Sequence, residues 1–182
     1  MSITLRWGAQ REDFGRAMMK VRLAKIVLVL AVAFYGAMGI FNFASWERGL
    51  AAVTTITSMS QLPQPAPWAT DSAIVAFLGL IFIGGSKLIG GVLCAVGAWK
   101  MWFARRASAR EFDESKAYAV LGCAVLLVLF FGGFLYLAAN FFGGFRTEFG
   151  RASASWAFEL GTSIALILLF LNQPEHASSG DD

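Results

Sequence analysis

The sequence predicts an all-α, polytopic membrane protein: a four-transmembrane-helix bundle with an N-terminal amphipathic segment. Of its 182 residues, 57% are hydrophobic and only 15% are charged, and 17 are phenylalanine. A water-soluble domain of this size has too little interior to bury so much apolar surface, so lipid must solvate much of the chain. Residues 73–102 form one long apolar run in which Lys87 is the only charged residue before Lys100. Residues 74–99 alone can cross a hydrocarbon core of about 30 Å.

Residues 1–23 are predicted to form a cytoplasmic basic segment. On a helix, one stripe of this segment is apolar and the rest is largely basic. The apolar stripe consists of Trp7, Phe14, Met18 and Val21. This pattern favours a helix lying in the membrane interface, with a solvated basic tail as the alternative. The apolar run that follows is longer than that of a signal peptide and has no convincing cleavage site, so we expect it to be retained.

Residues 45–72 separate the first two spans. Within them, residues 50–59 are weakly apolar and rich in Thr and Ser, which predicts either a short interfacial helix or a cap packed on the bundle. A proline cluster at residues 63–67 ends that helix. The membrane domain as a whole covers residues 24–171. Its spans are predicted at about 24–44, 74–99, 117–142 and 152–171, followed by a polar tail at 172–182 that has too few apolar residues to fold by itself.

The distribution of Lys and Arg predicts the orientation. The N-terminal segment has six and the second loop five, whereas the first loop has one and the third has two. The positive-inside rule therefore places the N-terminus, the second loop and the C-terminus in the cytoplasm. The expected location is a bacterial inner (cytoplasmic) membrane, in which both termini face the cytoplasm.

Lys87 is the residue on which a functional interpretation depends. A lysine near the bilayer centre costs about 2.5 to 3.5 kcal/mol, so we expect it to face the bundle interior, a water-filled cavity or a partner. Three roles are open: an ion pair with Glu159 in the fourth span, a contact with a partner or lipid headgroup, and a transport or proton-transfer role. The ion pair is favoured because both residues enter from the same membrane face and no further molecule is needed.

Other polar, small and aromatic residues have expected structural roles. Asn42 and Asn140 are placed near the outer ends of their spans, where asparagine usually hydrogen-bonds across a helix interface. Close helix packing is predicted at Gly84, Ser86, Gly90, Gly91 and Ala95. Anchoring at the membrane interface is predicted for Trp7, Trp46, Trp68, Trp99 and Trp102.

The sequence lacks the residues that several kinds of cofactor site and catalytic site require. The one histidine, His176, lies in the polar tail, so no bis-histidine haem site or His-rich metal site is expected within the bundle. No hydrolase, P-loop or dinucleotide-binding motif stands in a supporting context. Cys94 and Cys123 are placed at similar depth in the cytoplasmic half of the bilayer and are expected to stay reduced. We therefore expect no enzyme activity, no cofactor, no nucleic-acid partner and no soluble small-molecule substrate.

Three features together resemble a known family. They are Asn42 at the end of the first span, the SMSQLPQPAPW stretch at residues 58–68, and the Gly-rich second span. In these features the chain resembles a bacterial family of uncharacterised, predicted small integral membrane proteins, a domain-of-unknown-function family. The resemblance extends over most of residues 20–171. It implies a four-helix membrane protein and supplies no activity.

Two functional hypotheses follow. The first is an accessory or stabilising subunit of a larger inner-membrane complex, respiratory or photosynthetic, whose partners are the lipid bilayer and other integral membrane subunits. It rests on a small helical body that lacks cofactor ligands and is rich in Phe and Gly. The alternative is a small oligomeric transporter or channel that uses Lys87 in the membrane interior.

Overall fold

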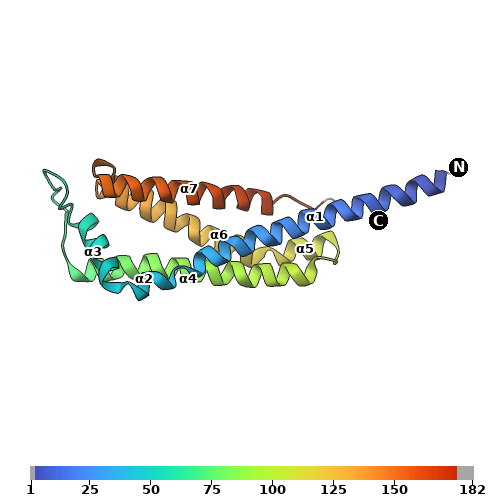
Figure 1. Cartoon of the computed structure of the whole chain (residues 1–182), viewed down its shortest axis with the longest axis horizontal. Coiled ribbons are helices and arrows are strands. Elements are labelled where there is room, and N and C mark those ends of the chain that lie inside the picture. The colour runs from blue at the N-terminus through green and yellow to red at the C-terminus, as the bar shows by residue number, and fades with distance from the viewer. Residues whose placement is uncertain (1–2, 176–182) are drawn as a thin grey trace.

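The computed structural model describes the backbone of residues 3–175 and the side chains of residues 15–175. Within this range, four helical stretches are long and apolar enough to cross a membrane, and no strand occurs. The helices form an elongated bundle whose long axis is horizontal in Figure 1. The predicted all-α, four-helix membrane fold is confirmed.

The first span differs from its predicted boundaries. Helix α1 (Ile3–Ala37) continues from the basic segment into the membrane without a break, so residue 24 does not separate two elements. A turn at residues 38–39 then divides α1 from the short α2 (Ile40–Ala44). Part of the predicted apolar stripe lies outside the residues whose side chains are described, namely Trp7 and Phe14.

The helix predicted at residues 50–59 is present as α3 (Trp46–Thr57), which begins and ends earlier than predicted. It lies across one end of the bundle, beside the start of α4 (Ala73–Ala104), as Figure 1 shows. Trp46 packs between two aromatic rings, with ring centroids 6.3 Å from Phe43 and 5.6 Å from Phe77. This end of the bundle is therefore covered by a packed helix.

The second loop contains a helix of its own. Helix α5 (Ala109–Ser115) begins with a capping box, in which the Ser108 hydroxyl accepts from the Glu111 amide and the Glu111 carboxylate accepts from the Ser108 amide. Helix α6 (Ala117–Leu127) follows directly. Helix α6 begins at residue 117, whereas the apolar helical stretch that could cross a membrane runs from Ala109 to Phe141.

The second half of the third span has π-helical geometry, η1 (Val128–Phe141). This wider winding is rare and often occurs at functional sites. A turn at η2 (Gly144–Arg146) leads into α7 (Glu148–Leu171), which begins four residues before the predicted 152. The Thr147 hydroxyl caps α7 by accepting from the Gly150 amide.

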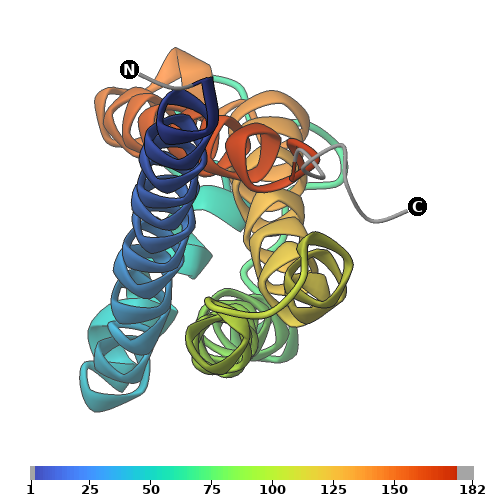
Figure 2. The same ribbon diagram turned by 90° about the vertical axis from the view of Figure 1, so that its right-hand side faces the viewer.

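Both described chain ends lie at one end of the bundle, which we call the terminal end; we call the opposite end, with α2, α3 and η2, the loop end (Figure 1). Viewed nearly along the bundle in Figure 2, α1 and α6 lie on opposite sides, and α4 and α7 occupy the other two. Helix α4 packs most extensively against α1 and α6. It is therefore the central element of the bundle.

Small residues let these helices approach closely. A Cβ atom at Gly91 would lie 2.8 Å from the Gly36 carbonyl carbon of α1, and one at Gly97 would lie 2.4 Å from the Ala119 nitrogen of α6. Contacts this short require glycine. Three of the predicted packing residues lie at such contacts. Gly84 packs against the Phe43 ring, Gly90 packs against Leu126, and Gly91 packs against α1. Ser86 is half-buried, and Ala95 is exposed, which corrects its predicted place in the packing face.

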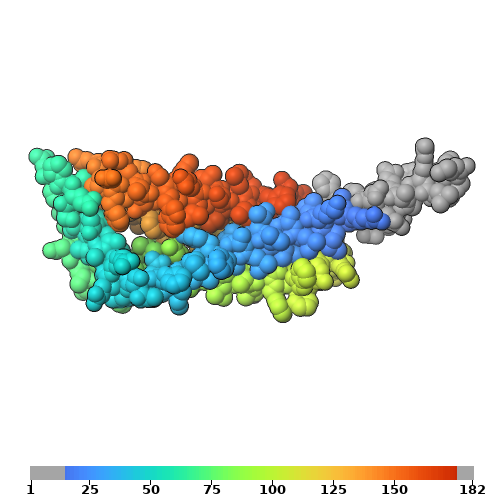
Figure 3. Space-filling view, viewed as in Figure 1, coloured from blue at the N-terminus to red at the C-terminus, as the bar shows by residue number. Residues whose placement is uncertain are grey.

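The four spans do not stay equally close along their length. The third span begins beside α4 at the terminal end and finishes beside α7 at the loop end (Figure 1). Toward the loop end, α7 and η1 therefore separate from α4, α2 and α3. The space-filling view shows the surface hollowed there between α7 and the α1–α2 segment (Figure 3).

Candidate functional site

A charged side chain lies in the middle of the bundle, where the spans begin to separate. Lys87 is near the middle of α4 and is 8% exposed. Its stem packs beneath the turn between α1 and α2, because a Cβ atom at Gly39 would lie 2.7 Å from the Lys87 Cβ. Glycine at position 39 therefore allows the turn to pass over the lysine.

The Lys87 ammonium contacts three other elements. Its Nζ donates a hydrogen bond to Asn42 Oδ1 at 3.4 Å, so this asparagine bonds across a helix interface. The same nitrogen lies 5.7 Å from the Tyr35 ring centroid and 5.3 Å from that of Trp156. Both distances are in the range of cation–π attraction, which stabilises the charged form of the amine.

Aromatic side chains surround this lysine. Phe130 and Trp156 have ring centroids 6.0 Å apart, and each lies about as close to Tyr35, at 5.8 and 6.1 Å. Phe134 completes the group, 6.4 Å from Trp156. Within the described chain, the Tyr35 hydroxyl is buried and has no hydrogen-bond partner. The lysine and this hydroxyl are therefore two polar groups inside one aromatic cluster.

The favoured ion pair between Lys87 and Glu159 is not formed. Glu159 lies near the middle of α7 but is exposed. At 100° per residue, it points almost opposite to the buried Ala154, Ala157 and Gly161 of the same helix. Trp156, one turn earlier in α7, contacts Lys87, but α7 is rotated so that the Glu159 carboxylate faces away from the bundle.

The placement of Lys87 also bears on the alternative of an oligomeric transporter or channel. The lysine points into the interior of a single chain and not onto a surface that several copies could surround. That alternative stays a prediction, and this placement does not favour it.

A second buried polar group, which we call the ion cluster, lies at the terminal end. It consists of Arg22, Lys25, Lys116, Asp113 and Glu175. The Glu175 carboxylate accepts from Lys25 Nζ at 2.8 Å and from Arg22 Nε at 3.1 Å, and Lys116 Nζ lies 3.6 Å away. Lys116 also pairs with Asp113. The side chains of the three cations and of Glu175 are at most 6% exposed.

Backbone carbonyls and one aromatic ring satisfy the remaining donors of the ion cluster. Arg22 donates to the carbonyls of Arg105 and Ala107, and both Lys25 and Lys116 donate to that of Gln173. The buried Phe112 ring lies 4.7 Å from the Arg22 guanidinium carbon. The ion cluster thus joins α1, the segment between α4 and α5, α5 with the following Lys116, and the residues after α7.

The start of the C-terminal tail packs against the bundle, so it is held by other segments and not by a core of its own. Glu175 anchors it, and the remaining residues 176–182, including His176, lie outside the described residues. Burial alone would raise the pKa of the Glu175 carboxyl. The hydrogen bonds from Lys25 and Arg22 and the charges of Lys25 and Lys116 outweigh burial, so its pKa lies below the ordinary value.

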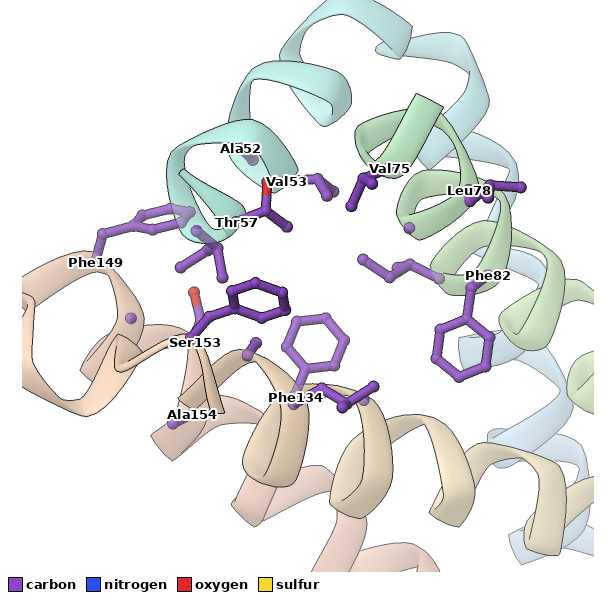
Figure 4. Close-up of a pocket in the computed structure, with 18 residues that line it drawn as sticks. Ala52, Val53, Thr57, Val75, Leu78, Phe82, Phe134, Phe149, Ser153 and Ala154 are labelled. Atoms are coloured by element: carbon purple, nitrogen blue, oxygen red, sulfur yellow. The ribbon is translucent and has the colours of Figure 1, made fainter. Parts of the chain in front are cut away.

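An apolar cavity of about 410 Å³ lies toward the loop end, between the separated spans. Side chains of α3, α4, η1 and α7 converge on it in Figure 4. Phe134 belongs both to this wall and to the aromatic cluster around Lys87. Thr57 and Ser153 contribute the hydroxyl groups in an otherwise hydrocarbon lining.

A family model described as "Predicted small integral membrane protein (DUF2165)" matches residues 21–174. The chain belongs to this family. The matched region contains Lys87, Glu159 and the cations of the ion cluster, and it ends one residue before Glu175. No curated protein and no solved structure matches this chain. Membership of DUF2165 confirms a multi-pass integral membrane protein of an uncharacterised family.

The remaining predicted residues are placed as follows. Asn140 is exposed, and its amide donates to Leu135 O within the same π-helical segment, not across an interface. Trp68 is exposed at the loop end and donates to the Phe141 carbonyl, whereas the exposed Trp99 and Trp102 lie on the terminal half of α4. Cys94 and Cys123 are both buried, free thiols. Within the described residues, no group of His, Cys, Asp or Glu could hold a metal ion.

Proposed function

We propose that this DUF2165 member is a non-catalytic accessory or stabilising subunit of a larger assembly in a bacterial inner membrane. The observation that carries the proposal is the outward-facing carboxylate of Glu159 in the middle of a membrane span. A charged group at that depth is costly when it faces lipid. A protein partner that provides a hydrogen-bond donor would remove this cost.

The face of α7 around Glu159 is suited to helix contact. Ala152, Ser155 and Ser163 fall on the same side of the helix, and all are exposed. Small side chains allow another helix to approach closely, and hydroxyl groups can hydrogen-bond across the interface. We expect the partner to present a transmembrane helix with a basic or amide side chain at the depth of Glu159.

The kind of assembly and the absence of catalysis are parts of the same proposal. A respiratory or photosynthetic complex stays a prediction from the small, helical, Phe-rich and Gly-rich composition. The absence of enzyme activity rests on the lack of a catalytic motif in its structural context. Purification of the partner would identify the assembly directly.

Glu159→Gln should reduce co-purification of the partner in mild detergent at least fivefold, because a neutral amide forms a weaker contact with a basic group. Quantitative mass spectrometry of the complex measures this loss. Glu148→Gln is the matched control, since Glu148 is also exposed but lies in the first turn of α7. The proposal fails if the two variants retain the partner equally, or if Glu159→Gln lowers the thermal stability of the isolated protein.

We also propose that both termini face the cytoplasm. The support is the bias of eleven Lys and Arg residues in the proposed inner segments against three in the outer loops. Reporter fusions after Trp68 and after Ala109 should show opposite sidedness, with the second one cytoplasmic. The same sidedness at both positions would contradict the topology.

A further inference from the structure

The charge of Lys87 is not neutralised by the protein around it. An ammonium group has three N–H donors. Within the described residues, Lys87 donates to Asn42 at the long distance of 3.4 Å and forms no ion pair. Glu159, the acid at similar depth, faces away from the bundle. The centre of the bundle therefore carries one uncompensated positive charge and has donors to spare.

A second observation also indicates a missing hydrogen-bond acceptor near Lys87. The buried Tyr35 hydroxyl has no partner within the described chain, although buried hydroxyl groups are normally hydrogen-bonded. The Tyr35 ring lies 5.7 Å from Lys87 Nζ, and Trp156 contacts both residues. Within the described chain, the Tyr35 hydroxyl therefore lacks an acceptor and the Lys87 ammonium has one distant acceptor, so both groups can donate further hydrogen bonds.

The enclosure restricts what the acceptor can be. Lys87 is 8% exposed and lies beneath the turn containing Gly39, with Trp156 on the side of α7. A carboxylate on another protein's helix would have to pass the Gly39 turn or the Trp156 ring to reach the amine. A phospholipid headgroup would have to leave the interface and enter the middle of the membrane, with its charge and hydration. A small ion with a single negative charge balances the charge of Lys87 without bringing a helix or a lipid chain into the bundle.

We propose that Lys87, Asn42 and Tyr35 form a binding site for a small monovalent inorganic anion of halide size, with Trp156 as one wall. The ammonium group supplies the attraction, and the Tyr35 hydroxyl supplies a further donor. Asn42 holds the amine from the loop-end side. A bound anion would neutralise the centre of the bundle and connect α1, α2 and α4 through one site. This site is independent of the partner surface around Glu159.

The first test is the thermal stability of the full-length protein in detergent at constant ionic strength. Exchange of sodium gluconate for sodium chloride or bromide should raise the melting temperature by several degrees, since the anion binds the folded state only. Lys87→Met should remove this increase. Lys100→Met is the matched control, because Lys100 is exposed near the end of α4, and it should retain the full increase. Equal melting temperatures of the unmodified protein in the three salts would overturn the proposal.

The second test is direct and does not depend on Lys87→Met folding normally. Bromide should quench tryptophan fluorescence with a saturable component that is absent in Trp156→Phe. Tyr35→Phe removes only the hydroxyl and should raise the bromide concentration for half-saturation about tenfold, the loss expected for one hydrogen bond to a charged group. A saturable component unchanged in Tyr35→Phe and Lys87→Met would show adventitious binding and overturn the site.

One variant separates this inference from the proposed function. Glu159→Gln should leave the response to chloride and bromide unchanged, whatever its effect on the partner. If Glu159→Gln and Lys87→Met both abolish a dimer seen by mass measurement, Glu159 of a second copy supplies the negative charge, and the free-anion site is wrong. Loss of the partner in Glu159→Gln with an intact anion response would support both proposals separately.

Discussion

Glu175→Gln should lower the free energy of unfolding in detergent by about 3 to 5 kcal/mol, the usual cost of breaking a buried ion pair from one side. The Glu175 side chain is 3% exposed and pairs with Arg22 and Lys25, which are 6% and 2% exposed. Removal of its charge leaves these cations without their shared counterion. Chemical denaturation followed by tryptophan fluorescence measures the loss.

The matched control for this change is Glu114→Gln, which removes the same charge from an exposed pair with Arg110. It should change stability little, because solvent screens surface pairs. Since the pKa of Glu175 is lowered on folding, its contribution is complete above the ordinary pKa of 4.5 and disappears as the pH falls through the lowered value. A Glu175→Gln protein as stable as Glu114→Gln would contradict the structural role of the ion cluster.

Gly97→Ala should lower stability by about 1 to 3 kcal/mol through overpacking, although alanine is the better helix former. The new Cβ atom would lie 2.4 Å from the Ala119 backbone nitrogen, and the backbone of α6 cannot move aside as a flexible side chain could. Helices α4 and α6 would have to separate. Thermal unfolding of the purified variant measures the effect.

Gly85→Ala on the same helix is the control, because no atom lies within 4 Å of the added Cβ. It should be as stable as the unmodified protein or slightly more stable. Equal melting temperatures for Gly85→Ala and Gly97→Ala would show that the close contact between α4 and α6 does not limit packing.

The placement of α7 shows where sequence reasoning could have gone further. Its buried residues include Gly150, Ala154, Ala157 and Gly161, which recur at helical spacing and mark the inner face. Glu159 lies opposite to that face, so a helical projection of the two glycines, Gly150 and Gly161, places the carboxylate on the outward side. The predicted pairing with Lys87 rests on entry from the same membrane face, which does not report rotation about the helix axis.

The sequence gives a weaker indication of the ion cluster. Glu175 is separated by 150 residues or more from Lys25 and Arg22, and a short polar sequence after the last span resembles a solvated tail. An acid just beyond a span, on the side where the basic residues are concentrated, was the available indication. Its burial depends on α1, α5 and α6 meeting at one point, and no local pattern specifies that.

The sequence by itself determined which segments lie in lipid, roughly where they begin and end, and the depth of Lys87 and Glu159. It did so because the free energy of transfer from water to lipid depends on the composition of each segment, which a run of apolar residues shows directly. Only the tertiary structure decided that Lys87 points inward, that Glu159 points outward and that Glu175 is buried. Rotation about each helix axis is set by close contacts such as Gly36 with Gly91, which join residues far apart in the chain.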